Sequence, residues 1–270
     1  MAAGIMGHSS ALVADGVESL ADAAGSLVTL QGVRVGRRPA DANHPYGHGK
    51  AEAVAALIVC VLLVVAAGFI AVEAIRELII PHAAPAAWTL IVVVIVIVAK
   101  ESLHRFMHSR ASAEASVALE AEAWHHRADA LTSVAALIGI AAAVYGPRLT
   151  GWMWLVGADE VAALVASGVI LIVAWRISAP PLHELLDEMP AELVAEVRDI
   201  AAAVPGVAAV EKVLARKSGR GYLVDMHVHV AGNLPLRAAH ALGGLVRATV
   251  KAQHPRVRDV LIHLEPAEEN

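Results

Sequence analysis

The class of this protein is decided by the stretch Ala53-Val-Ala-Ala-Leu-Ile-Val-Cys-Val-Leu-Leu-Val-Val-Ala-Ala-Gly-Phe-Ile-Ala-Val72, which contains no charged residue. A helix needs about 20 consecutive apolar residues to cross the ~30 Å hydrocarbon core of a bilayer. The stretch is long enough, so it predicts a membrane-spanning helix. The single cysteine, Cys60, lies inside it, which excludes both a disulfide framework and a cluster of thiolate ligands.

Four further segments are predicted to span the membrane, at residues 86–99, 130–147, 161–175 and 11–33. The first three carry no charge, whereas 11–33 carries three acids in otherwise small and apolar sequence. The whole chain of 270 residues is 57% hydrophobic and only 17% charged, while a soluble domain has about 25% charged residues. We therefore expect a helical membrane bundle of five spans, and we exclude a disordered chain, a nucleic-acid binder and an ordinary cytosolic enzyme.

The basic residues of the loops predict the orientation of the spans, because cytoplasmic loops carry an excess of Lys and Arg. Segments 34–50 and 100–110 are rich in Lys and Arg, whereas 81–87 has none and 146–158 has only Arg148. We therefore place the two basic segments, read as loops, and the C-terminal region on the cytoplasmic side of the cell (inner) membrane.

Charged residues become frequent beyond Ser178, and we divide the chain there into a transmembrane domain, 1–178, and a cytoplasmic domain, 179–270. The pattern of the second domain predicts a helix at 190–204, strands at 207–216 and 222–230, a helix at 235–253 and a strand at 257–265. In the second strand, polar residues such as His227 and His229 alternate with apolar ones, which is typical of a half-buried strand. The order α-β-β-α-β indicates a small α+β ferredoxin-like domain.

Ionisable residues inside the predicted spans form two groups with helical spacing. Asp15, Glu18 and Asp22 fall at i, i+3 and i+7, and His125 and Asp129 fall at i and i+4, so each group shares one helix face. A carboxylate at bilayer depth costs about 2.5–3.5 kcal/mol on insertion scales. Two carboxylates from the first group facing the His–Asp pair would make a tetrahedral site for a divalent metal. In the alternative reading, the acids lie at the membrane interface or are satisfied by Ser and Thr hydroxyls.

A second candidate metal site lies in the loop after residue 33. Asp41, His44 and His48 are spaced i, i+3, i+7 in a loop kept compact by Pro45 and two glycines. Mixed oxygen and nitrogen donors at this spacing can hold a metal, although three polar loop residues can equally well be solvated. The sequence has neither a nucleophile motif nor a phosphate-cradling loop, so no enzyme is predicted.

Two longer motifs carry a family resemblance. They are His8-Ser-x-Ala-Leu-x-Ala-Asp-Gly-x-Glu-Ser-x-x-Asp22 and Arg38-Pro-Ala-Asp-x-Asn-His-Pro-Tyr-Gly-His-Gly-Lys-x-Glu52, and His125-x-x-x-Asp129 completes the pattern. Together they closely resemble the cation diffusion facilitator family over essentially the whole chain. The resemblance implies a homodimeric exporter that exchanges cytoplasmic divalent metal for protons by alternating access. It also implies a transport site made of Glu18, Asp22, His125 and Asp129.

Two departures from the family pattern affect these expectations. Family members usually have Asp or His where this chain has Glu18, and an oxygen-rich ligand set accepts manganese or ferrous iron as well as zinc. The family has six spans, whereas five are predicted here. We expect either a start codon internal to a longer reading frame, which we favour, or a five-span variant.

The resemblance also implies sites in the cytoplasmic part of the protein. A binuclear metal site that bridges two copies of the domain would use Glu211, His227, His240, His263 and Glu265. His229 matches no family position and is read as an exposed surface histidine. Lys50 and Asp187 fall at the positions of a charge interlock at the cytoplasmic membrane face.

The resemblance thus implies a divalent metal efflux transporter, a metal/proton antiporter for zinc, iron or manganese. Its expected partners are the lipid bilayer, a second copy of the chain and protons as counter-substrate, with no nucleic acid. The alternative is a membrane metal sensor, or a scaffold that stabilises another transporter without transporting metal itself.

Overall fold

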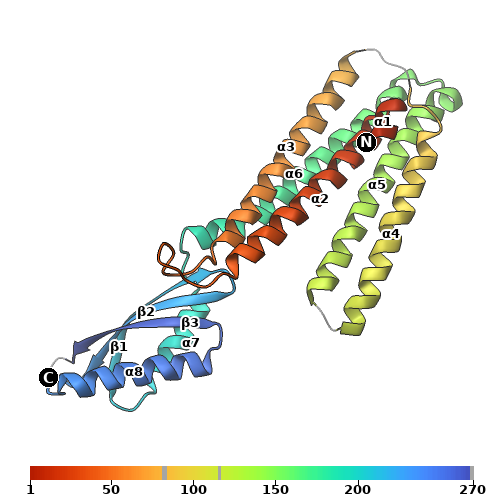
Figure 1. The fold of residues 1–270 in the computed structure, drawn as a ribbon. Coiled ribbons are helices and arrows are strands. Elements are labelled where there is room, and N and C mark those ends of the chain that lie inside the picture. The colour runs from red at the N-terminus through yellow and green to blue at the C-terminus, as the bar shows by residue number, and fades with distance from the viewer. Residues whose placement is uncertain (81–83, 115–116, 268–270) are drawn as a thin grey trace. The chain divides into compact units, whose positions relative to one another are not determined.

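The computed structural model describes residues 1–80, 84–114 and 117–267; within these, the side chains of Met107 and of residues 110–128 lie outside the description. The chain divides into two compact units. The membrane unit consists of residues 1–26 and 59–176, and the cytoplasmic unit of residues 27–58 and 177–270. Figure 1 shows the helices and strands of both units.

All five predicted spans are helical. The helices of this part of the chain are α1 (Ala2–Met6), α2 (Ser10–Gly36), α3 (Ala51–Ile79), α4 (Thr89–Glu114), α5 (Val117–Thr150), the short 3-10 helix η1 (Met153–Gly157) and α6 (Ala158–Leu185). Three stretches of the described residues are long and apolar enough to cross a membrane, namely Ala51–Ile79, Asp129–Thr150 and Met153–Leu185. In helices α2 and α4, charged residues interrupt the apolar sequence.

The prediction of a loop at residues 100–110 is wrong, because α4 continues through this segment to Glu114. No Gly or Pro interrupts the helix, and charge alone does not end one. Arg105 Nε donates to Glu101 Oε1 at 2.8 Å, an i, i+4 ion pair that fits the helical register.

Small side chains bring the helices of the membrane unit close together. Ala14 of α2 packs with alanines of α3 and α6, including Ala67 and Ala163. Ala11 packs instead with α4 and α5, around Ile140, and α4 and α5 run side by side (Figure 1). Alanine lets helix backbones approach each other closely inside a membrane. Helix α2 therefore contacts both groups of helices, and its acids lie among them.

The outer faces of these helices are apolar. On α3, Val61, Val65 and Phe69 are exposed, although they are large hydrophobic residues. Such a continuous exposed surface is unfavourable in water and is typical of contact with lipid. Trp152 and Trp154, at η1, are also exposed, and tryptophan is enriched where a bilayer meets water.

The cytoplasmic domain has the predicted α-β-β-α-β order. Its elements are α7 (Ala191–Ala202), β1 (Val207–Ser218), β2 (Gly221–Val230), α8 (Leu236–Gln253) and β3 (Val257–Pro266). The sheet has the strand order β1-β2-β3, with β1 and β2 antiparallel and β2 and β3 parallel. The α+β fold predicted for this region is confirmed.

The alternation in β2 divides the sheet into two different faces. Val224, Met226 and Val228 are buried in a core that also contains residues of α7 and α8. His227 and His229 point to the opposite face and are only partly buried. One face of the sheet is therefore covered by helices, while the other presents imidazoles.

Glycines shape the loop that follows α2. Gly47 has a φ of +82°, a conformation that side chains with a Cβ rarely adopt. At Gly49 an added Cβ would lie 2.7 Å from the carbonyl oxygen of Ser218 at the end of β1. The backbone of the loop thus contacts the end of this strand so closely that no larger residue fits without a shift.

We expect Gly49→Ala to destabilise the cytoplasmic unit by about 1–3 kcal/mol, the usual cost of overpacking a close contact. Gly68→Ala is the matched control, because an added Cβ at Gly68 in α3 meets nothing within 4 Å. The measurement is the midpoint of thermal unfolding of the detergent-solubilised chain. Equal midpoints for the two variants would contradict the close contact.

Candidate metal sites

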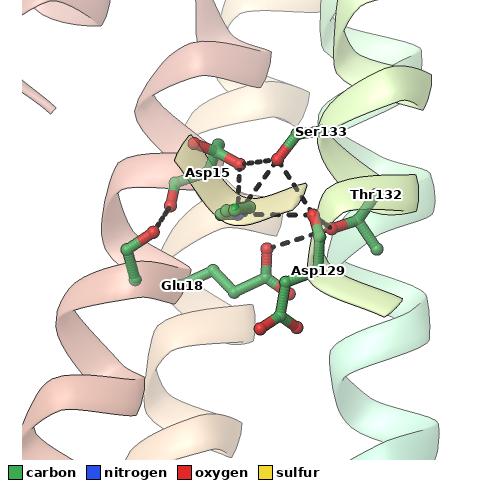
Figure 2. Close-up of polar contacts among 7 residues, drawn as sticks. Asp15, Glu18, Asp129, Thr132 and Ser133 are labelled. Atoms are coloured by element: carbon green, nitrogen blue, oxygen red, sulfur yellow. Dashed lines mark hydrogen bonds and ion pairs between the residues drawn. The ribbon is translucent and has the colours of Figure 1, made fainter. Parts of the chain in front are cut away.

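Three carboxylates are buried in the membrane unit at one level of the bundle. Asp15 and Glu18 on α2, and Asp129 on α5, are each less than a tenth exposed. Thr132 Oγ1 donates to the carbonyl oxygen of Asp129 at 2.8 Å and lies 3.4 Å from Glu18 Oε2 (Figure 2). A single turn of α5 therefore meets the acidic face of α2, and Figure 2 shows the side chains of Glu18 and Asp129 next to each other.

Lys100 of α4 joins this group. Its Nζ donates to Asp15 Oδ1 at 2.8 Å and to Ser133 Oγ at 3.0 Å, and lies 3.4 Å from the carbonyl oxygen of Asp129. Ser133 Oγ donates in turn to Asp15 Oδ1. The charge of Asp15 is thus balanced by an ammonium group.

Sequence reasoning missed Lys100, because it counted the residue only as a cytoplasmic loop charge. Its side chain is 15% exposed and lies within the bundle. The available signal was its position, since Lys100 directly follows the charge-free run 86–99 without a helix-breaking residue. A charged residue next to such a run can reach a partner inside the bundle.

A small cavity lies beside these carboxylates. Its volume is about 10 Å³, and its polar lining comes from Asp15, Glu18 and Thr132. The other lining residues are all alanines, from α2, α5 and α6. A cavity of this size holds about one water molecule, and so has room for a single metal ion next to two carboxylates.

The predicted transport residues are only partly brought together in the described structure. Glu18 and Asp129 lie next to each other (Figure 2). Asp22 lies one helical turn further along α2 and is half-buried. His125 belongs to α5, one turn before Asp129, but its side chain lies outside the described residues. The set of four remains a prediction.

The predicted loop cluster is brought together. Asp41 Oδ1 lies 3.1 Å from His44 Nδ1, and Asp41 Oδ2 lies 3.4 Å from His48 Nε2. The backbone N–H groups of His44 and Asn43 also donate to Asp41, and the bond from His44 chiefly lowers the pKa of this carboxyl. Ligand atoms of the three predicted residues lie within 4.8 Å of one another, which is close enough for one metal ion.

Two groups of potential ligands lie on the open face of the sheet and share Glu265. Glu265 Oε1 lies 2.6 Å from His227 Nδ1 and 3.4 Å from His263 Nε2. Glu265 Oε2 lies 3.2 Å from His229 Nε2, and Glu211 Oε2 lies 3.1 Å from the same nitrogen. The register explains these contacts, because His227 pairs with His263 and His229 with Glu265 on adjacent strands.

His229 and His240 differ from their predicted places. The sequence reading left His229 as a surface residue, whereas the structure puts it between Glu211 and Glu265. The alternation of His229 with His227 was the signal that both histidines lie on one face of β2. The bulge between Val210 and Lys212, which brings Glu211 to His229, could not be predicted. His240 is exposed on α8, which packs on the covered face of the sheet, so it does not join the cluster within the described part of one chain. Its role stays a prediction.

Comparison with known proteins places both parts of the chain. Residues 1–186 match the model of the cation efflux transmembrane domain, and residues 189–267 match that of the cation efflux protein cytoplasmic domain. The chain belongs to the cation diffusion facilitator family. It is therefore a cation efflux transporter and no enzyme, a multi-pass membrane protein whose C-terminal domain is cytoplasmic and implies homodimerisation.

Relatives in this family cover nearly the whole chain. The manganese efflux system protein MneP of Bacillus subtilis is 31% identical over 264 residues, which are 97% of this chain and 89% of MneP. The cation-efflux pump FieF of Cronobacter sakazakii is 32% identical over 93% of this chain and 81% of FieF. Among solved structures, a MamM CTD is 26% identical and covers 29% of this chain and 98% of its own, with a TM-score of 0.28.

The predicted charge interlock corresponds to an ion pair within the cytoplasmic unit. Lys50 Nζ donates to Asp187 Oδ1 at 2.7 Å, and both side chains are about two-fifths exposed. Exposed ion pairs of this kind contribute only about 0–1 kcal/mol to stability. A functional role of this ion pair would therefore come from the positions in which it holds Lys50 and Asp187, and not from its contribution to stability. That role remains a prediction.

The ion pair between His229 and Glu211 affects the pKa of His229. The hydrogen bond that His229 Nε2 donates to the Glu211 carboxylate, together with the negative charge of Glu211, raises the pKa of His229 above 6.5. We expect Glu211→Gln to lower the pKa of His229 in the metal-free protein, because the neutral amide stabilises the imidazolium less. Histidine NMR titration of the full chain measures the shift. Glu192→Gln, an exposed change on α7, is the control; equal pKa values in both variants would contradict the assignment.

Proposed function

We propose that this cation diffusion facilitator is a metal/proton antiporter that works as a homodimer by alternating access. The observation that carries the proposal is that the side chains of Glu18 and Asp129, from two different helices, lie next to each other inside the membrane unit (Figure 2), where Glu18 also lines a cavity of about 10 Å³. Two buried carboxylates are costly in a membrane unless they bind a cation or a proton. We assign Glu18, Asp22, His125 and Asp129 to the transport site.

The chemistry of these donors supports manganese, ferrous iron or zinc as substrate. Three carboxylates and one imidazole form an oxygen-rich set, and carboxylate ligands suit manganese, while imidazole suits zinc and iron. The relative MneP is named as a manganese efflux system protein. On this ground we propose manganese and iron, as well as zinc, as substrates.

Proton coupling follows from the same ligands. A protonated carboxyl group and an imidazolium bind metal only after losing a proton, so loading the site from the cytoplasm releases protons and unloading it outside takes them up. The ion pair between Lys100 and Asp15 balances the fourth acid. Asp15 is therefore not assigned to the transport site.

The cytoplasmic part supports a regulatory role. We propose that residues 179–270 form a domain that binds metal through Glu211, His227, His263 and Glu265, together with His240. Metal there would stabilise one arrangement of the two copies over another, and would shift transport only by its differential affinity for the two states. The loop residues Asp41, His44 and His48 are a further candidate site for the same metals.

Proteoliposomes test the antiport directly. The chain is reconstituted with a metal-sensitive dye inside, and metal uptake is followed with and without a pH gradient, acidic inside. We expect uptake to rise when the gradient is imposed and to fall when a protonophore dissipates it. Metal flux independent of the gradient would overturn proton coupling. Bound metal without any flux would favour the alternative, a non-transporting sensor or scaffold.

A further inference from the structure

The cytoplasmic unit contains a second cavity, lined by arginine rather than by acids. Its volume is about 310 Å³, within the range of small-ligand sites. The charged side chains of its lining are those of Arg37, Arg38, Arg220, Arg256, Arg258 and Glu52. A formal charge of about +4 is thus concentrated in one cavity of a chain whose net charge is −5.

These arginines have few acidic partners. Arg220 Nε lies 3.9 Å from Glu52 Oε1, a long ion pair between two partly exposed side chains. Over the described residues, no carboxylate lies within ion-pair distance of Arg37, Arg38 or Arg258. Five cations gathered with one acid repel each other, so an anion in the cavity would stabilise the arrangement.

The structure also holds some of the guanidinium groups in place. Arg256 lies over the ring of Tyr222, 5.2 Å from the ring centroid, and its Nη2 donates to the tyrosine hydroxyl at 3.1 Å. The methylenes of Arg258 pack on Gly221, where an added Cβ would come within 2.5 Å of them. Arginines that are oriented in advance lose less conformational freedom when they bind a ligand.

Membrane topology explains only part of this cluster. Arg37 and Arg38 directly follow α2, where basic residues set the orientation of a span. Arg258 lies in β3, and Arg220 and Arg256 lie in the turns that directly precede β2 and β3, far along the chain from any span, so these three have no such role. All five cations are arginines, and the planar guanidinium matches phosphate oxygens bidentately in a way that lysine does not.

We propose that this cavity binds a phosphate-bearing anion. Two sources share this chemistry, the headgroup of an anionic phospholipid and a soluble phosphate compound. Gly36, the last residue of α2, and Glu52, in the first turn of α3, line the cavity, so its lining includes the cytoplasmic ends of two membrane helices. Basic pockets in this position bind the headgroups of the negatively charged cytoplasmic leaflet.

The test compares two double variants of the full chain that remove the same charge. Arg256→Gln with Arg258→Gln changes the cavity, whereas Arg237→Gln with Lys251→Gln removes two exposed charges from α8. Native mass spectrometry counts phosphatidylglycerol retained against phosphatidylcholine. Calorimetry with inorganic pyrophosphate, on chains in phosphatidylcholine nanodiscs, measures binding of a soluble anion. Metal binding by the cytoplasmic domain shows whether each variant is folded.

We expect the cavity variant to weaken binding by about tenfold or more, because each lost guanidinium removes a charge-assisted, bidentate contact with phosphate. The α8 variant should bind as the unchanged chain does. A loss confined to phosphatidylglycerol supports the lipid source, and a loss confined to pyrophosphate supports the soluble one. Equal binding by both double variants, or no binding of either probe by the unchanged chain, would overturn the proposal.

Discussion

Asp129→Asn is expected to reduce metal flux into proteoliposomes by about 100-fold or more, since changing even the outer partners of metal ligands costs about 10–100-fold. The substitution keeps the size of the side chain and removes only its negative charge. It leaves Thr132 bonded to the carbonyl oxygen of residue 129, which belongs to the backbone. A change in flux would therefore report on the carboxylate and not on the packing of α5.

The same reasoning applies to the partner acid on α2. We expect Glu18→Gln to lower flux as strongly, while Glu18→Asp, which keeps the charge, should retain transport with an altered preference among manganese, iron and zinc. Asp199→Asn on α7 is the matched control, because it makes the same exchange at an exposed position. Normal metal flux in Asp129→Asn, measured beside this control, would refute the assignment of the transport site.

Local patterns in the sequence were enough for the elements of the fold. The charge-free runs predicted the membrane helices, and the alternation from Leu223 to Val230 predicted both faces of β2. These features depend on the spacing of neighbouring residues, which the sequence displays directly. The end of α4 was missed, since a cluster of charges was taken as a loop although nothing breaks the helix there.

Contacts between distant segments could not be predicted in the same way. Lys100 meets Asp15 only because α2 and α4 pack together, and Glu211 reaches His229 only through a bulge in β1. The arginine cavity combines residues that are more than a hundred positions apart. Each of these depends on register or helix packing, for which one sequence carries no direct signal.

Glu265→Gln is expected to weaken metal binding by the cytoplasmic domain more than any other single change there. Glu265 is the one residue shared by both groups of potential ligands on the sheet, and each of its oxygens contacts a different group. An amide in its place offers a neutral oxygen to one group only. We expect affinity to fall by about 10–100-fold for both groups.

The pattern across variants makes this prediction specific. Glu211→Gln should weaken only the group that contains His229, and His263→Gln only the group that contains His227, so that each leaves the other group intact. The titrations use the full chain carrying Asp129→Asn, so that the transport site does not contribute, with a competing chelator to measure affinity. His254→Gln, which changes a histidine outside both groups, is the control.

Metal binding by the ligands on the sheet depends on pH and on the position of Glu265. Metal binding at imidazoles must weaken as the pH falls, because each histidine has to release its proton before it binds. The contacts of Glu265 with three histidines satisfy its charge in the metal-free state, so the carboxylate is already positioned when a metal replaces those protons. If Glu265→Gln reduced binding by no more than Glu211→Gln does, the shared carboxylate would not link the two groups, and they would have to be treated as independent sites.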